Sequence, residues 1–181
     1  MKKFLFYLVE WTWALPINLI GFIAYIIFAV IKGCKHERFF NATVTYVPGD
    51  WGGISFGTFI FMNPDRPDDW LRDTKIHEYG HTWQALLLGP IWFLVIAIPS
   101  FIWCNFKPCI NYRKNNNVSY YSLYCEAWAN AWGQKFTGLK QTRIGKGVLK
   151  KNSRCVVGTA PYELVMTKAR FVGVDDHIDP K

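Results

Sequence analysis

Histidine and closely spaced cysteine are the residue types that this sequence has little of. Its 181 residues include four histidines and five cysteines, and no two cysteines form a Cys-x-x-Cys pair. An odd cysteine count without that spacing indicates neither a disulfide framework nor a zinc site built from cysteines. Cys104 and Cys109 are near enough in sequence to pair, but reduced thiols are the simpler expectation.

Recognition motifs and repeats are missing as well. The formal net charge is +8, but no nucleic-acid recognition motif accompanies it, so nucleic acid is not an expected partner. No internal repeat or low-complexity block is present. What the chain does have is 51% hydrophobic residues and nine tryptophans, which is heavy for a soluble protein of one domain. We expect part of the chain to meet lipid, with its basic charge facing anionic headgroups.

The N-terminal segment 1–31 is predicted to be a transmembrane helix. Residues 11–31 carry no charge, and about 20 apolar residues are enough to cross the hydrocarbon core, although Pro16 and Asn18 make the helix irregular. A cleaved signal peptide is the alternative, but the apolar run is long and no small-x-small site follows it. The basic run 32–38 favours a cytoplasmic position for this end of the helix. The expected location is a bacterial inner membrane, with the active site facing the cytoplasm.

The pattern then changes to β structure. Residues 42–47 and 54–62 predict two strands around a glycine-rich turn at 48–53. The second of these strands is a candidate to pair with an extended substrate, and an ordinary hairpin is the alternative. Carboxylates after Pro67 suit the start of a helix, which should run from about residue 69 to residue 88.

The remainder of the chain alternates between apolar and basic segments. Residues 85–106 are apolar and long enough to span a bilayer, but the glycine and prolines within them make a re-entrant excursion an equal alternative. A polar, basic loop at 107–119 leads into another helix, which Gly133 and Gly138 are expected to end. The last segment, 135–181, is predicted to be a basic tail that is either solvated or lies on acidic lipid headgroups.

A His-Glu-x-x-His motif lies in the middle of the predicted helix 69–88. On a helix, His77 and His81 project from the same face, so both imidazoles can reach one metal ion while Glu78 lies beside them as a general base. A catalytic zinc typically has three protein ligands and a water whose pKa the metal lowers to about 7. The alternative is a solvent-facing helix that carries two histidines by chance.

A third ligand is predicted on the next helix. Glu126 is the only charged side chain between Lys114 and Lys135, in an aromatic and alanine-rich pattern where an unpaired carboxylate would be costly. Asn130 lies one helical turn further on, where it could accept a hydrogen bond from the outer nitrogen of a liganding histidine. The alternative for Glu126 is an ion pair with a nearby lysine or arginine.

These residues give the chain a resemblance to the gluzincin branch of the zincin metallopeptidases, in which a glutamate on a second helix completes the zinc site. Residues 70–134 are also similar to small bacterial membrane proteins that carry the same HEYGH element. The resemblance implies an α+β fold, with a mostly helical, membrane-associated, zincin-like domain at 32–134 and one zinc per chain. Gluzincins commonly have Glu-x-x-x-Asp on the second helix, whereas this chain has Asn130, which orients a histidine without adding negative charge.

Three functions are open at this point. The first is a membrane-anchored zinc metallopeptidase that cuts a peptide or protein substrate near the bilayer. The second is a non-catalytic membrane protein whose structural zinc joins two helices, which requires a fourth ligand such as Cys125 or His177. The third, a basic membrane-surface adaptor without metal, leaves the coincidence of His77, His81 and Glu126 unexplained.

A peptidase also needs a hydrogen-bond donor for the oxyanion that develops during hydrolysis. The sequence does not rank the candidates, which are Tyr120, Tyr121, Tyr124 and His36. The ligand set suits zinc best, although cobalt or manganese can occupy such sites in vitro.

Overall fold

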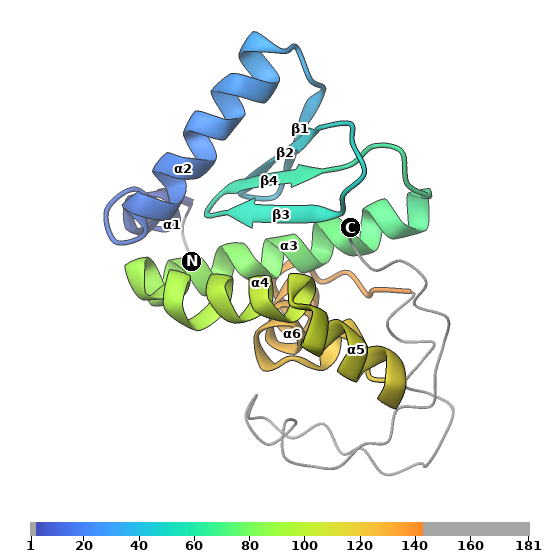
Figure 1. Ribbon diagram of the computed structural model, residues 1–181. Helices are drawn as coiled ribbons and strands as arrows, with labels where there is room; N and C mark the ends of the chain where they lie inside the picture. Colours follow the sequence, from blue (N-terminus) through green and yellow to red (C-terminus); the bar gives the residue numbers. More distant parts are fainter. Residues whose placement is uncertain (1–2, 143–181) are drawn as a thin grey trace.

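A long helix, α3, lies between a small sheet and a second group of helices (Figure 1). The structure is a computed structural model that describes residues 3–142, so most of the predicted tail, including His177, lies outside the described residues. The predicted α+β class, mostly helical with a small sheet before the motif helix, is confirmed. The helical elements are α1 (Lys3–Glu10), α2 (Leu15–Tyr25), η1 (Ile26–Ile31), α3 (Asp68–Leu88), η2 (Gly89–Ile91), η3 (Phe93–Ala97), α4 (Ile98–Asn105), α5 (Lys107–Asn116), η4 (Tyr120–Ser122) and α6 (Tyr124–Thr137).

The sheet has four strands in the order β1-β2-β4-β3, where β1 is His36–Phe39, β2 Ala42–Tyr46, β3 Gly53–Phe56 and β4 Phe59–Met62. The prediction of a single strand at 54–62 is wrong, because a turn at Gly57 and Thr58 folds this segment into the antiparallel pair β3 and β4. Gly57 has a φ of 59°, which glycine adopts without steric cost. As a result β4 pairs with β2 in parallel and β3 lies at an edge of the sheet.

Helix α3 begins and ends where the sequence predicts. Asp69 accepts a hydrogen bond from the backbone N–H of Trp70 at 2.8 Å, which satisfies one of the free donors of the first turn. The helix ends at Gly89, whose φ is 53°. One face of α3 packs on the sheet through a core that includes Val44, Ile60, Met62, Trp70 and Tyr79.

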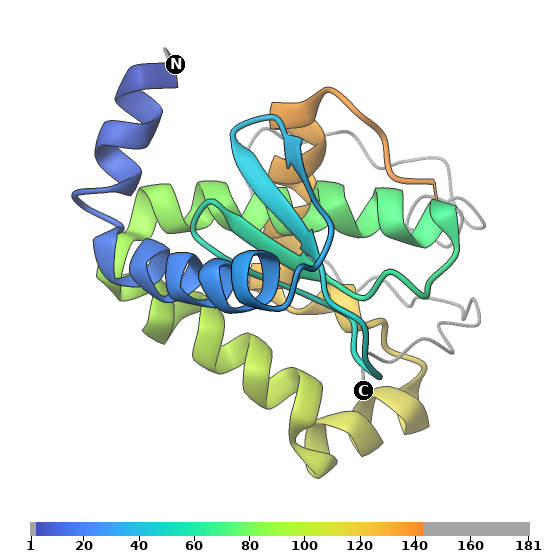
Figure 2. The same cartoon turned by 90° about the horizontal axis from the view of Figure 1, so that it is seen from above.

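Helix α6 crosses α3 at very close range (Figure 2). A Cβ atom on Gly80 would lie 1.9 Å from the carbonyl oxygen of Ala129, and one on Gly133 would lie 2.0 Å from that of Ile76. Each helix therefore contributes a glycine that lets the other backbone approach. The prediction that Gly133 ends the helix is wrong: α6 continues to Thr137 and ends at Gly138, whose φ is 71°.

The N-terminal segment is bent, so the predicted single helix over 1–31 is wrong. The axis of 3–10 makes an angle of 93° with that of 15–31. Pro16 stands at the start of α2, and the Asn18 amide donates to the backbone carbonyl of Glu10 at 2.9 Å and also to its carboxylate. The Asn18 side-chain oxygen accepts from the backbone N–H of Thr58 at 3.0 Å, which ties the bend to the β3–β4 turn.

The second apolar segment is bent as well. The axis of 68–91 makes an angle of 118° with that of 93–105, and the break follows Gly89 and Pro90. Residues 85–106 therefore do not form one straight helix, and both alternatives, a span and a re-entrant excursion, stay predictions. Within residues 3–142 no single helix has both the length and the apolar character needed to cross a membrane, whereas each of these bent pairs meets that criterion taken together.

Two further boundaries differ from the predictions. The loop expected at 107–119 is largely the helix α5, which has Pro108 in its first turn and ends at Asn117 in the left-handed conformation. The tail expected from residue 135 is not found over 135–142, because α6 continues to Thr137 and Gln141 and Thr142 return to α3. The rest of the predicted tail lies outside the described residues. The Gln141 amide donates to the carbonyl of Asp73 at 3.0 Å, and the Thr142 N–H donates to the Asp73 carboxylate at 2.8 Å.

Candidate metal centre

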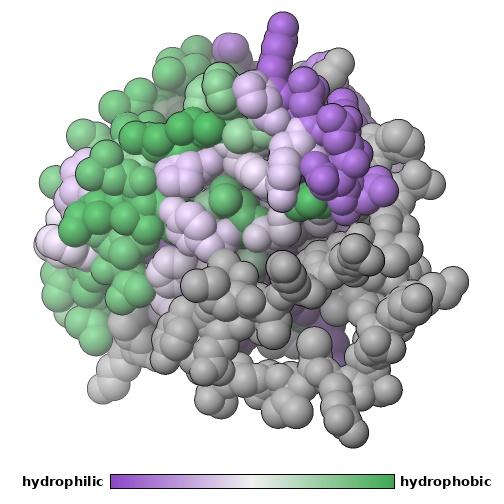
Figure 3. All heavy atoms as spheres, turned by 60° about the horizontal axis from the view of Figure 1, so that its bottom comes forward, coloured by the Kyte–Doolittle hydropathy of each residue, from purple (hydrophilic) through white to green (hydrophobic). Residues whose placement is uncertain are grey.

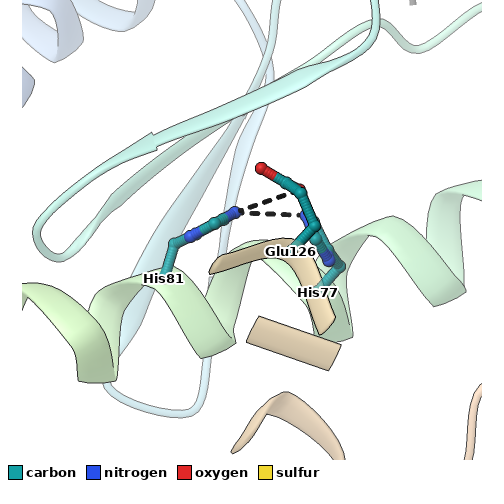
Figure 4. A group of neighbouring side chains, drawn as sticks. All are labelled: His77, His81 and Glu126. Carbon is teal, nitrogen blue, oxygen red and sulfur yellow. Dashed lines mark hydrogen bonds and ion pairs between the residues drawn. The ribbon is translucent and has the colours of Figure 1, made fainter. Parts of the chain in front are cut away.

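Three buried side chains point toward one another where α3 and α6 cross (Figure 4). His77 and His81 come from α3 and Glu126 from α6, and their ligand atoms all lie within 4.8 Å of one another. Glu126 Oε2 is 3.0 Å from His77 Nε2 and 3.6 Å from His81 Nε2, and the two Nε2 atoms are 3.2 Å apart. The group could therefore hold a metal ion. No other group of three such side chains is found among the described residues.

The local sequence accounts for this convergence. A spacing of four residues places His77 and His81 on one face of α3. Glu126 reaches that face because α6 approaches α3 without side chains between them at Gly80 and Gly133. The Glu126 side chain is 1% exposed, and its ion-pair partners are the two histidines, so the alternative of a lysine or arginine partner is wrong.

Both histidines make a hydrogen bond through the outer nitrogen. His77 Nδ1 lies 2.8 Å from Asn130 Oδ1, the contact that the sequence predicts, and His81 Nδ1 lies 2.6 Å from Gln84 Oε1. The Gln84 amide group donates to the carbonyl of Cys125 at 2.9 Å, so its oxygen must face His81. An amide oxygen only accepts, and each histidine therefore carries its proton on Nδ1 and turns the Nε2 lone pair inward.

With these tautomers, the groups that face one another are all hydrogen-bond acceptors. The two Nε2 lone pairs and the Glu126 carboxylate converge, and Glu126 Oε2 is a buried oxygen without a hydrogen-bond donor. Such a group needs a cation or a proton. Without a metal, His81 takes up that proton: burial alone would lower its pKa, but the charge of Glu126 and the hydrogen bond that the added Nε2 proton donates to it raise the pKa to about 9. Burial would raise the pKa of Glu126, but the two histidines hold it well below its usual range.

Glu78 lies beside this group, between α3 and the edge strand β3. It is 5% exposed, and a Cβ atom on Gly53 would come within 3.0 Å of its Oε1. The glycine on β3 thus leaves room for the carboxylate.

The four candidates for the oxyanion donor differ in the contacts that their side chains make. The ring of Tyr121 packs edge-on against His77, with the ring centroids 5.3 Å apart. The hydroxyl of Tyr120 hydrogen-bonds Ser100 at 3.2 Å, and burial together with the nearby charge of Glu126 raises its pKa well above the usual range.

The side chains of the other two candidates contact other parts of the chain. The Tyr124 hydroxyl donates to the carbonyl of Val95. His36 is on β1, where its ring packs against Tyr25 at the end of α2. Tyr121 is the candidate that contacts a histidine of the group.

The cysteines do not extend the ligand set. None of the four described cysteines forms a disulfide, and Cys155 lies outside the described residues. Cys125 Sγ is 3.8 Å from Glu126 Oε1 and is not part of the converging group. Burial raises the pKa of the Cys125 thiol, which disfavours the thiolate that would bind a metal. Among the described residues the site thus has three ligands.

Two amides of the site were not predicted. Gln84 lies three residues after His81, one helical turn away, so the helical spacing that located Asn130 could have located Gln84 too. The Gln141 amide donates to Asn130 Oδ1 at 2.9 Å and fixes its orientation. No sequence signal marks Gln141, because it lies beyond the end of α6 in the stretch predicted to be a tail.

Comparison with protein-family models, with curated proteins and with solved structures gives no match for this chain. The resemblance to gluzincins therefore rests on His77, Glu78, His81 and Glu126, and the function is argued from the geometry of these residues.

Proposed function

We propose that this protein is a zinc-dependent peptidase that acts at a membrane surface. The observation that carries the proposal is the convergence of three buried metal-ligand atoms with no hydrogen-bond donor among them, beside the buried carboxylate of Glu78. Two histidines and one glutamate are a ligand set that catalytic zinc sites use. Three protein ligands leave a position for water, whereas a structural zinc is enclosed by four.

The chemistry divides among residues of the two crossing helices. His77, His81 and Glu126 would hold the zinc ion, which when bound acts as a Lewis acid and lowers the pKa of a water molecule. Glu78 would take a proton from the attacking water and pass it to the leaving amine. Tyr121, which lies against His77, donates a hydrogen bond to the developing oxyanion.

Both histidines have a neutral hydrogen-bond partner, which keeps the negative charge of the site low. Asn130 and Gln84 orient the imidazoles but add no negative charge, so Glu126 is the one anionic ligand. Less charge donated to the metal favours a lower pKa for the bound water. The amide at Asn130 is thus compatible with hydrolysis, although gluzincins commonly have a carboxylate there.

The edge strand β3 is positioned to hold the substrate. An extended peptide that pairs with β3 would alternate its side chains between the two faces of the sheet. On one face Gly53 lies against Glu78. On the other face, Ile54 and Phe56 line an apolar cavity of about 280 Å³ together with Phe28, Trp51 and Phe61. This arrangement favours substrates with an apolar side chain next to the cleaved bond.

Metal content is the first test. Elemental analysis of the purified full chain should find one zinc, and both His77→Ala and Glu126→Ala should lose it. If zinc persists in Glu126→Ala, the third ligand lies elsewhere and the proposed site is wrong.

The Glu78→Gln variant separates a catalytic zinc from a structural one. It should keep zinc and lose roughly 10²- to 10⁴-fold in the rate of hydrolysis of a mixed peptide library, because the amide cannot take a proton. Hydrolysis at the wild-type rate would exclude Glu78 as the base. A wild type that binds zinc but cleaves no peptide in the library would favour the structural alternative.

A further inference from the structure

The two bent helix pairs meet at their bends. We call them the first elbow (3–31) and the second elbow (68–105). The indole N–H of Trp13 donates to the carbonyl of Leu87 at 3.3 Å, and a Cβ atom on Gly89 would lie 2.4 Å from the Trp13 ring. Side chains of both elbows share one core cluster that includes Ala14, Ile17, Ala85, Trp92 and Ile96. The elbows are therefore one packed unit.

The outer surface of this unit is apolar. Two exposed stripes at helical spacing point away from the core, and together we call them the apolar face: Leu19, Ile23 and Ile27 on α2 and η1, and Leu94, Ile98 and Phe101 on η3 and α4. Leu94 is 68% and Phe101 69% exposed. Figure 3 shows apolar atoms gathered on the side of the molecule that carries α1, α2 and α4, with the polar atoms toward the opposite side.

We propose that the apolar face inserts both elbows into one leaflet of a lipid bilayer, so that the protein enters the membrane from one side without crossing it. Lipid is the occupant that fits because the face extends over both elbows and its apolar segments end at basic residues. Lys3 begins α1, Lys32 follows η1 and Lys107 follows α4, where each can meet anionic headgroups. The inference does not depend on the metal site being catalytic.

Insertion from one side follows from the contacts that stabilise the bends. To form a straight span, the first elbow would have to pull Asn18 away from Glu10 and Thr58 and leave a carboxyl group in hydrocarbon. It would also have to separate Ala14 and Ile17 from the second elbow. The bent form keeps Asn18 bonded to Glu10 and Thr58 and turns the apolar face outward.

Vesicle flotation of the full chain tests the surface. The wild type should float with vesicles of mixed zwitterionic and anionic lipid, and the double variant Leu94→Gln/Phe101→Gln should partition about a hundredfold more weakly, because each change removes a buried apolar side chain. The control is Leu139→Gln, which is 41% exposed but lies after α6, and it should bind as the wild type does. Zinc content of each variant confirms that the fold is intact.

Equal flotation of the double variant and the wild type would overturn the proposal. So would a soluble homodimer that the double variant converts to a monomer without a change in vesicle binding, since the face would then bind a second copy of the chain.

Cysteine labelling tests the one-sided insertion. Each test chain keeps buried Cys125 and one cysteine for labelling, which is Cys34, Cys104 or one introduced by Lys3→Cys. All remaining cysteines are changed to serine. An impermeant maleimide outside sealed vesicles should label all three positions before lysis. Labelling of Cys34 or of position 3 only after lysis would show that the first elbow crosses the bilayer and would overturn the proposal.

Discussion

Helices approach closely in two regions, where α6 crosses α3 and where the two elbows meet. The side chains in the first region are polar, and those in the second are apolar. At the crossing, glycines bring the backbones together, and the space beside them is filled by glutamate and by histidines that hydrogen-bond amide side chains. At the elbows, apolar side chains pack inward and others remain exposed. Helix α3 takes part in both regions. Its middle carries the histidines of the candidate metal site, and its C-terminal end belongs to the apolar surface of the second elbow.

The glycine contact should be the most sensitive feature of the crossing. Gly80→Ala places a methyl group where the Ala129 carbonyl lies, so the helices must separate and Glu126 must withdraw from the histidines. We expect a loss of about 3 kcal/mol in the free energy of unfolding and loss of stoichiometric zinc. Thermal or urea unfolding and metal analysis check both.

The matched control for that change is Gly33→Ala. Gly33 has a φ of 68° but no atom within 4 Å of an added Cβ, so only backbone strain of about 1 kcal/mol is expected, with zinc retained. Equal effects of the two variants would mean that the close approach of the helices does not position the site.

Tyr121 tests whether the crossing is built for catalysis as well as for binding. Tyr121→Phe keeps the ring against His77 but removes the hydroxyl, and we expect kcat to fall roughly 10²- to 10³-fold with zinc content unchanged. Tyr112→Phe, on the exposed part of α5, should leave kcat as it is. A normal kcat for Tyr121→Phe would assign the oxyanion contact to another group.

Gln84 tests the smaller contribution of an orienting amide. Gln84→Ala removes the acceptor that holds the proton of His81 on Nδ1, so zinc affinity should fall about 10- to 100-fold. Competition with a chelator measures this, and Asn116→Ala at the exposed end of α5 is the control. An unchanged affinity would show that the histidine is oriented without the amide.

The effect of pH should differ between the metal-free and the zinc-bound protein. The pKa of His81 is raised to about 9 in the metal-free fold, above its unfolded value, so this stabilisation is complete below about pH 6.5 and is lost as the pH rises toward 9. Zinc displaces the same proton, so the stabilisation that zinc adds should grow over this window. Urea unfolding with and without zinc measures both curves, and parallel curves would contradict the assignment.

Much of the candidate site could be read from sequence because it depends on helical spacing. His77, Glu78 and His81 are fixed relative to one another by α3, and Asn130 follows Glu126 by one turn of α6. Gln84 obeys the same spacing and was overlooked. Gln141 could not be found in this way, because its contact with Asn130 joins residues that no local periodicity relates.

The fold could not be predicted from the sequence at points where one residue changes the direction of the chain. A continuous apolar run predicted a straight helix over 1–31, but Asn18 bends it by bonding to Glu10 and Thr58. A continuous β pattern predicted one strand at 54–62, but the positive φ at Gly57 divides it. In both cases the partners that stabilise the turn lie far away in sequence.

The sequence by itself determined which residues can bind a metal and on which helices they lie, because the α-helical repeat sets those positions locally. Only the tertiary structure decided that the two helices approach closely enough for Glu126 to meet both histidines, and that the apolar segments bend. Those outcomes depend on distant contacts at Gly80, Gly133 and Asn18, where the free energy of packing and of pairing buried polar groups outweighs local preference.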